Sequence, residues 1–325
     1  MKKIFALMMC AVMTAAAAAG CGEKKDDDKK ENRLSVVCSI FPEYDWVRQI
    51  AGDKADDMDL TLLLDNGLDL HNYQPTTEDI VKISECDVFI YVGGESDTWA
   101  DKALSTAKNK DMQVINIMDV LSDRVKEEEV IEGMQAEEEE AEEEEGPEYD
   151  EHVWLSLSNA SFVCDAVADS LAAADSENAE TYRTNLEDYK KQLDGLDSEY
   201  REMAAGAERK TVVFGDRFPF RYMMDDYSID YYAAFVGCSA ETEASFETIV
   251  FLADKVDEFS LPGIFKIDSS DGTIAKTIIE NTKESDQKIF TLNSMQSVNT
   301  SDIEKGTTYL SIMKDNLESL REALK

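Results

Sequence analysis

The chain of 325 residues contains two histidines, and both lie in segments predicted as loops. His71 precedes Thr76 and Asp79, whose spacing is that of a capping box, so it lies between a strand and the helix that this box opens. His152 follows an acidic run. Ligands of parallel α/β sheets bind at loops after strands, and imidazole with carboxylate suits a borderline divalent cation such as Zn²⁺. The alternative is two ordinary surface histidines.

The charge balance restricts the partners that the chain can have. It carries 70 acidic and 32 basic residues, a formal net charge of −38. This charge repels a phosphate backbone, so we expect no nucleic-acid partner and favour divalent cations. The densest acidic run, within residues 126–149, contains two blocks of four glutamates. It predicts a disordered loop that is either a solvated spacer or a cation-collecting segment beside a site.

The N-terminal segment resembles a bacterial lipoprotein signal peptide. Two lysines precede an apolar run over residues 4–19, which is shorter than the ~20 residues of a membrane-spanning helix. The following Ala-Ala-Gly-Cys21 resembles a lipobox, whose cysteine becomes lipid-modified. We therefore expect a signal peptide over residues 1–20, a polar tether over 21–33, and lipid anchoring in the cell envelope, on the outer side of the cytoplasmic membrane. The alternative is an ordinary signal peptide with a chance cysteine.

Short β-branched runs alternate with helical stretches, which predicts an α/β fold of two lobes, each a mostly parallel four-stranded sheet flanked by helices. The expected strands are 34–40, 59–64, 87–92, 113–117, 211–214, 229–236, 263–267 and 288–292. From Tyr182 to Met203, apolar residues recur in steps of four and three, which predicts one long rigid helix joining the lobes rather than a coiled coil. The expected bounds are 34–157 for the N-terminal lobe, 158–208 for the helical region and 209–325 for the C-terminal lobe.

Cysteine usage does not predict a disulfide framework. Beyond Cys21, the chain has four widely spaced cysteines and no CxxC motif: Cys38, Cys86, Cys164 and Cys238. Export would permit disulfides, but a chain of this size has enough apolar residues to fold without them. We expect buried free thiols.

Three motifs together resemble the metal-binding lipoproteins of zinc and manganese ABC importers. They are Gly67-x-x-x-His71-x-Tyr73-x-Pro75-Thr76, the run Val88–Gly94, and His152-x-Trp154-Leu155-Ser156, and the final segment from Gly306 is also similar. The resemblance runs in register from about residue 34 to the last helix. It implies a monomeric solute-binding lipoprotein that captures Zn²⁺, or Mn²⁺, for an ABC permease. One ion would lie between the lobes, with His71 and His152 as ligands.

The same resemblance implies two further ligands in the C-terminal half, where this chain departs from the family's pattern. The third position, usually His or Glu, is Arg217, and the fourth, usually Asp, is Leu292. Neither side chain can ligate. Asp216 is the neighbour of the third position and is expected either to replace it or to cap the next helix. Glu243 and Asp268 resemble acids near the site in relatives, as ligands or as groups that orient the histidines.

The sequence alone leaves two other functions open. A metal-dependent hydrolase would need an open coordination position and a general base, and the sequence has no HExxH motif, GxSxG motif or third histidine. We therefore expect no enzyme. A surface adhesin, or a binding lipoprotein for another ligand, gains weight because two expected ligands are missing. Zn²⁺ is preferred over Mn²⁺ because the affinity order of divalent metals favours it.

Overall fold

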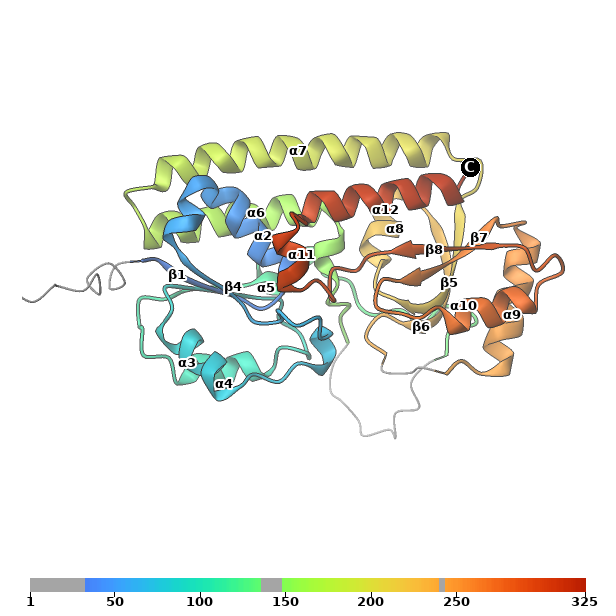
Figure 1. Ribbon diagram of the computed structural model, residues 1–325, viewed down its shortest axis with the longest axis horizontal. Helices are drawn as coiled ribbons and strands as arrows, with labels where there is room; N and C mark the ends of the chain where they lie inside the picture. The colour runs from blue at the N-terminus through green and yellow to red at the C-terminus, as the bar shows by residue number, and fades with distance from the viewer. Residues whose placement is uncertain (1–32, 136–147, 240–242) are drawn as a thin grey trace, which may run out of the picture. The chain divides into compact units, whose positions relative to one another are not determined.

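The computed structural model describes residues 33–135, 148–239 and 243–325. The predicted signal peptide and Cys21 lie outside the described residues. Leu34–Lys325 forms one compact unit, which contains two four-stranded sheets with helices packed on them (Figure 1). Every strand pairing in both sheets is parallel, so the predicted fold class is confirmed.

All eight predicted strands are present. The first sheet has the order β2-β1-β3-β4 and the second β6-β5-β7-β8. Their bounds are β1 Ser35–Cys38, β2 Asp59–Leu62, β3 Val88–Tyr91, β4 Gln113–Asn116, β5 Thr211–Phe218, β6 Asp230–Val236, β7 Gly263–Ile267 and β8 Lys288–Leu292. β3 reads Val-Phe-Ile-Tyr and is buried at every position, as expected of a parallel strand covered on both faces.

β5 extends beyond its predicted end at residue 214. A register shift after Phe214 lets the strand resume its pairing with β6 at Arg217 and Phe218. Asp216 and Arg217 are therefore strand residues. The alternative role of Asp216 as a helix cap is wrong, since α8 (Arg221–Tyr227) has Phe220 at its N-cap and no side-chain cap.

Helices cover both sheets. In the first half they are α2 Phe41–Ala51, α3 Thr77–Glu85, α4 Trp99–Ser105, α5 Ile117–Leu121 and α6 Leu157–Ala174. After α8, the second half has α9 Phe246–Glu258, α10 Thr273–Glu280, α11 Thr300–Glu304 and α12 Tyr309–Ala323. Among the described residues, none of these helices has both the length and the apolar content that crossing a membrane requires.

The long predicted helix is α7, Ala179–Gly206, and it lies along both lobes (Figure 1). It contacts α2 in the first lobe and α8 and α12 in the second. Its buried stripe consists of Tyr182, Tyr189, Leu193, Leu196, Tyr200, Met203 and Ala204. One continuous cluster of buried apolar residues includes strands of both sheets, so the two lobes share a core and α7 is a stiff connector.

The described flanks of the acidic segment are structured. Glu127 forms an antiparallel bridge with Tyr149, and the backbone N–H of Gln135 donates to Ala234 O (2.9 Å) beside β6. Met134 packs against the main core, because these flanks contain apolar residues as well as glutamates. The prediction of disorder over 126–149 is therefore wrong for both flanks, and residues 136–147 lie outside the described part.

Candidate metal centre

His71 lies in the short 3₁₀ turn η3 (Leu70–Asn72), in the loop after β2. Asp69 caps this turn, since its Oδ1 accepts the backbone N–H of His71 (3.1 Å). The ring Nδ1 lies 2.7 Å from Ser96 Oγ. This contact fixes the ring through Nδ1 and leaves Nε2 available. The predicted capping box of Thr76 and Asp79 at the start of α3 is also present.

His152 is completely buried and immediately precedes the 3₁₀ turn η5 (Val153–Leu155). Asp150 Oδ1 lies 2.9 Å from both the backbone N and the ring Nδ1 of His152. The ring therefore donates its Nδ1–H to the carboxylate and keeps the lone pair on Nε2. A carboxylate that orients a histidine in this way is typical of metal sites.

The C-terminal lobe holds the His152 loop in place. Tyr222 Oη in α8 donates to Asp150 O (2.8 Å), and Ser156 Oγ donates to Asp226 Oδ2 (2.6 Å). These two bonds with α8 fix the loop that carries His152 between the lobes.

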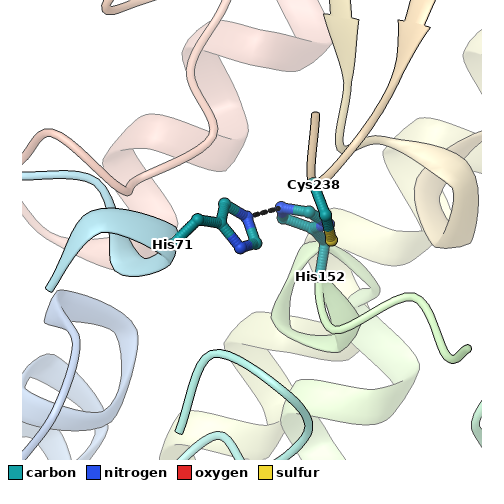
Figure 2. A group of neighbouring side chains, drawn as sticks. All are labelled: His71, His152 and Cys238. Carbon is teal, nitrogen blue, oxygen red and sulfur yellow. Dashed lines mark hydrogen bonds between the residues drawn. The ribbon is translucent and has the colours of Figure 1, made fainter. Parts of the chain in front are cut away.

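The two histidines converge, as Figure 2 shows, with their Nε2 atoms 3.3 Å apart. Two Zn–N bonds of about 2.0–2.1 Å that meet at a tetrahedral angle separate their nitrogens by roughly 3.3–3.4 Å. The pair is therefore already spaced for one ion. Cys238 approaches from the loop after β6, and its sulfur and one ring nitrogen from each histidine lie within 4.8 Å of one another. Within the described residues, this is the single such group of three or more His, Cys, Asp or Glu side chains.

The protonation of the ligand atoms follows from burial. Burial, and next the neighbouring His152 ring, lower the pKa of His71 to about 4, against the opposing effect of Asp69. Because a metal binds neutral imidazole, protons compete little for His71 near neutral pH. Burial also raises the pKa of the Cys238 thiol, and the carboxylates of Glu128 and Glu151 raise it further. Without an ion, Cys238 is therefore protonated.

A cavity of about 450 Å³ opens beside the cluster, with His71 and Cys238 in its wall. Four carboxylates line it: Glu95, Glu128, Glu148 and Glu151. Glu151 is buried, and its Oε1 accepts the backbone N–H of Ser96 (2.9 Å). Its Oε2 has no hydrogen-bond partner within the described part of the chain. Carboxylates concentrated in a cleft raise the local concentration of cations.

The three acids that the sequence suggested lie elsewhere. Asp216 accepts the backbone N–H groups of Arg217 (2.9 Å) and Ile267 (3.4 Å), which joins β5 to β7. Asp268 accepts the backbone N–H of Ser294 (2.8 Å) and so holds the loop after β8. Glu243 is exposed and lines a second cavity. The structure thus brings His71 and His152 together and does not place these acids in their cluster.

Sequence reasoning missed Cys238. The free thiols of Cys38, Cys86 and Cys164 are buried as expected, but Cys238 is only half-buried. A signal was available: Cys238 comes two residues after the end of β6, and ligands of parallel sheets bind at the carboxyl ends of strands. The absence of a CxxC motif obscured it, because the other two members of the cluster come from distant loops.

Comparisons with known proteins agree on one family. The family model described as zinc-uptake complex component A, periplasmic, matches residues 36–323. The zinc-binding lipoprotein AdcA of Streptococcus pneumoniae is 30% identical over 293 residues, which are 90% of this chain and 56% of that protein. The chain therefore spans just over half the length of this relative. The high-affinity zinc uptake system protein ZnuA of Bacillus subtilis is 28% identical over 298 residues, 91% of this chain and 89% of that protein.

A solved structure of similar extent matches the fold. The Zn(II)-bound ZnuA-like domain of Streptococcus pneumoniae AdcA is 27% identical, with a TM-score of 0.70. The match covers 90% of this chain and 99% of that domain. Both described lobes therefore correspond to one such domain.

Proposed function

The chain belongs to the family of periplasmic zinc-uptake complex component A proteins, and from this premise we propose that it captures Zn²⁺ between its lobes and delivers it to an ABC permease. The His71–His152 pair carries the proposal, because its Nε2 atoms are already 3.3 Å apart. Each ring is held through Nδ1, by Ser96 or by Asp150. The family membership, not the absence of catalytic motifs, decides against the hydrolase: the protein is not an enzyme.

The donor set favours zinc over manganese. Neutral imidazole suits Zn²⁺, whereas Mn²⁺ prefers carboxylate, carbonyl and water oxygens. We propose that the acidic cavity beside His71 collects hydrated cations and raises their concentration at the histidines. Glu128 and Glu148, in the two described flanks of the acidic segment, line this cavity and would take part in collecting the cations.

Equilibrium dialysis with metal analysis tests the proposal. The purified protein, dialysed against Zn²⁺ with an excess of Mn²⁺, should retain one zinc per chain. The excess tests selectivity, because both ions would enter an acidic cavity but only zinc is favoured by the imidazoles. Retention of neither metal would contradict zinc capture and favour the adhesin or other-ligand alternative.

We propose that Cys21 carries the lipid that anchors the protein to the outer side of the cytoplasmic membrane, where a monomer works beside its permease. Cys21→Ala should then release the protein into the soluble fraction, since a lipid is its one proposed anchor. Fractionation and immunoblotting measure this, with Cys10→Ala as the matched control that stays in the membrane fraction. A Cys21→Ala protein that remains fully membrane-bound would refute lipid anchoring.

Asp150→Asn should weaken zinc binding by about 10–100-fold, because it removes the charge that holds the Nδ1–H of His152. The amide oxygen can still accept the backbone N–H, so the fold should persist. Competition with a chromophoric chelator measures the affinity. Asp188→Asn is the matched control, since its side chain forms an exposed ion pair with Lys191. Equal affinities for the two variants would show that Asp150 does not orient the ligand.

A further inference from the structure

We propose that Cys238 is the third protein ligand of the captured ion, so that two imidazoles and one thiolate hold the zinc. The inference rests on the proposed zinc capture and specifies its ligand set. Its first support is the cluster itself: the Cys238 sulfur and one ring nitrogen from each of His71 and His152 lie within 4.8 Å of one another. A tetrahedral zinc ion separates such sulfur and nitrogen ligands by roughly 3.5 Å.

The backbone before Cys238 is shaped for this approach. A Cβ atom on Gly237 would lie 3.0 Å from His152 Cε1 and 3.0 Å from Phe218 O. These distances are tighter than side chains normally tolerate, so glycine allows the chain to pass close to the His152 ring. This close passage places the thiol of Cys238, the next residue, beside His71 and His152.

Arg217 occupies the position that the family resemblance assigns to the third ligand. Its side chain contacts both the loop that carries Cys238 and the turn that carries His71. Its guanidinium has no acceptor atom and cannot ligate. Nη1 donates to Ser239 O (3.4 Å), next to Cys238, and Nη2 pairs with Asp69 Oδ2 (2.5 Å). Asp69 in turn caps the turn of His71. The missing ligand at residue 217 is therefore replaced by the thiolate at residue 238, with Arg217 as a positioning residue.

This ligand set has defined chemical consequences. On binding, a Zn–S bond forms, the S–H bond breaks and the proton passes to solvent, so the ion, one thiolate and two neutral imidazoles carry a net single positive charge. Three protein ligands leave a fourth position for water, as in zinc sites that exchange ligands. Such a site suits a carrier that must release its ion. Thiolate is a soft donor and adds to the preference for zinc over manganese.

Cobalt(II) substitution tests the thiolate directly, because a cobalt–sulfur bond gives a near-ultraviolet charge-transfer band that nitrogen and oxygen ligands do not give. The full-length protein should develop this band with one equivalent of Co²⁺. Cys238→Ser should lose the band. Its zinc affinity should fall by at least about 10–100-fold, which is the loss typical when only the hydrogen-bond partner of a ligand is removed. Cys86→Ser is the matched control that keeps the band, since Cys86 is buried away from the cluster and donates to Ile83 O.

The outcomes separate the inference from zinc capture itself. A one-to-one cobalt complex without the band, together with unchanged zinc affinity of Cys238→Ser, would overturn the role of Cys238 and leave zinc capture intact. Absence of both cobalt and zinc binding in the unmodified protein would overturn both.

A second measurement avoids any substitution of Cys238. X-ray absorption at the zinc edge of the zinc-bound protein should show one sulfur ligand at about 2.3 Å beside nitrogen ligands at about 2.0–2.1 Å. A zinc shell that contains nitrogen and oxygen ligands without sulfur would also overturn the proposal.

Discussion

Replacing either His71 or His152 with alanine is expected to abolish high-affinity zinc binding, together with the rise in thermal midpoint that zinc confers. Each ring supplies one of the two converging Nε2 atoms. Zinc at 100 times its dissociation constant stabilises the folded state by about 2.7 kcal/mol. A variant that has lost a ligand should lose most of this. Thermal unfolding with and without zinc measures it, each variant being compared with its own metal-free form.

The double variant separates a shared ion from two independent sites. Because the residues share one ligand, the double change should cost far less binding free energy than the sum of the single changes. Glu243→Gln is the control, since Glu243 is an exposed side chain outside the cluster. It should keep the full zinc-induced stabilisation. Full stabilisation in both single histidine variants would remove the metal-capture account.

Trp154→Ala is expected to lower the free energy of unfolding by about 3–5 kcal/mol, the usual cost of deleting a buried tryptophan. The side chain is 1% exposed, and its Nε1 donates to Ser294 O (2.9 Å) in the C-terminal lobe. Its backbone carbonyl accepts the hydroxyl of Tyr309 (2.7 Å) at the start of α12. The change therefore leaves a cavity beside His152 and removes the side-chain donor of the Ser294 carbonyl, whereas the bond from Tyr309 to the backbone of residue 154 persists.

Urea unfolding of the metal-free protein measures this cost. Phe246→Ala is the matched control, because Phe246 is 77% exposed, and substitutions at such sites change stability by only about 0.5 kcal/mol. A Trp154→Ala cost as small as that of the control would show that the contact between the lobes does not stabilise the protein.

The fold could be predicted from the sequence because its signals are local. Continuous apolar runs such as Val88–Tyr91 identify strands buried on both faces, and the stripe from Tyr182 to Met203 identifies the helix between the lobes. The extension of β5 was missed because Gly215 and Asp216 resemble a turn, whereas the pairing of Arg217 with β6 is a tertiary effect. The flanks of the acidic segment were missed for a similar reason, since the partner of Gln135 is about a hundred residues away.

The site was predictable only in part. His71 and His152 stand in motifs that identify them, and the structure places them together. Asp216 and Asp268 carry the right chemistry, but they are engaged by backbone N–H groups of neighbouring strands and loops. Cys238 carries no motif, and its approach depends on Gly237 and on the ion pair of Arg217 with Asp69. Which side chains converge across two lobes is decided by long-range packing that sequence spacing does not reveal.

The most direct test is the anomalous diffraction of zinc-bound crystals, measured above and below the zinc absorption edge. We expect one zinc peak between His71 and His152, about 2.0–2.1 Å from each Nε2. The absence of a peak between these nitrogens, or a single peak on carboxylates elsewhere in the chain, would contradict the central claim that the histidine pair captures the ion.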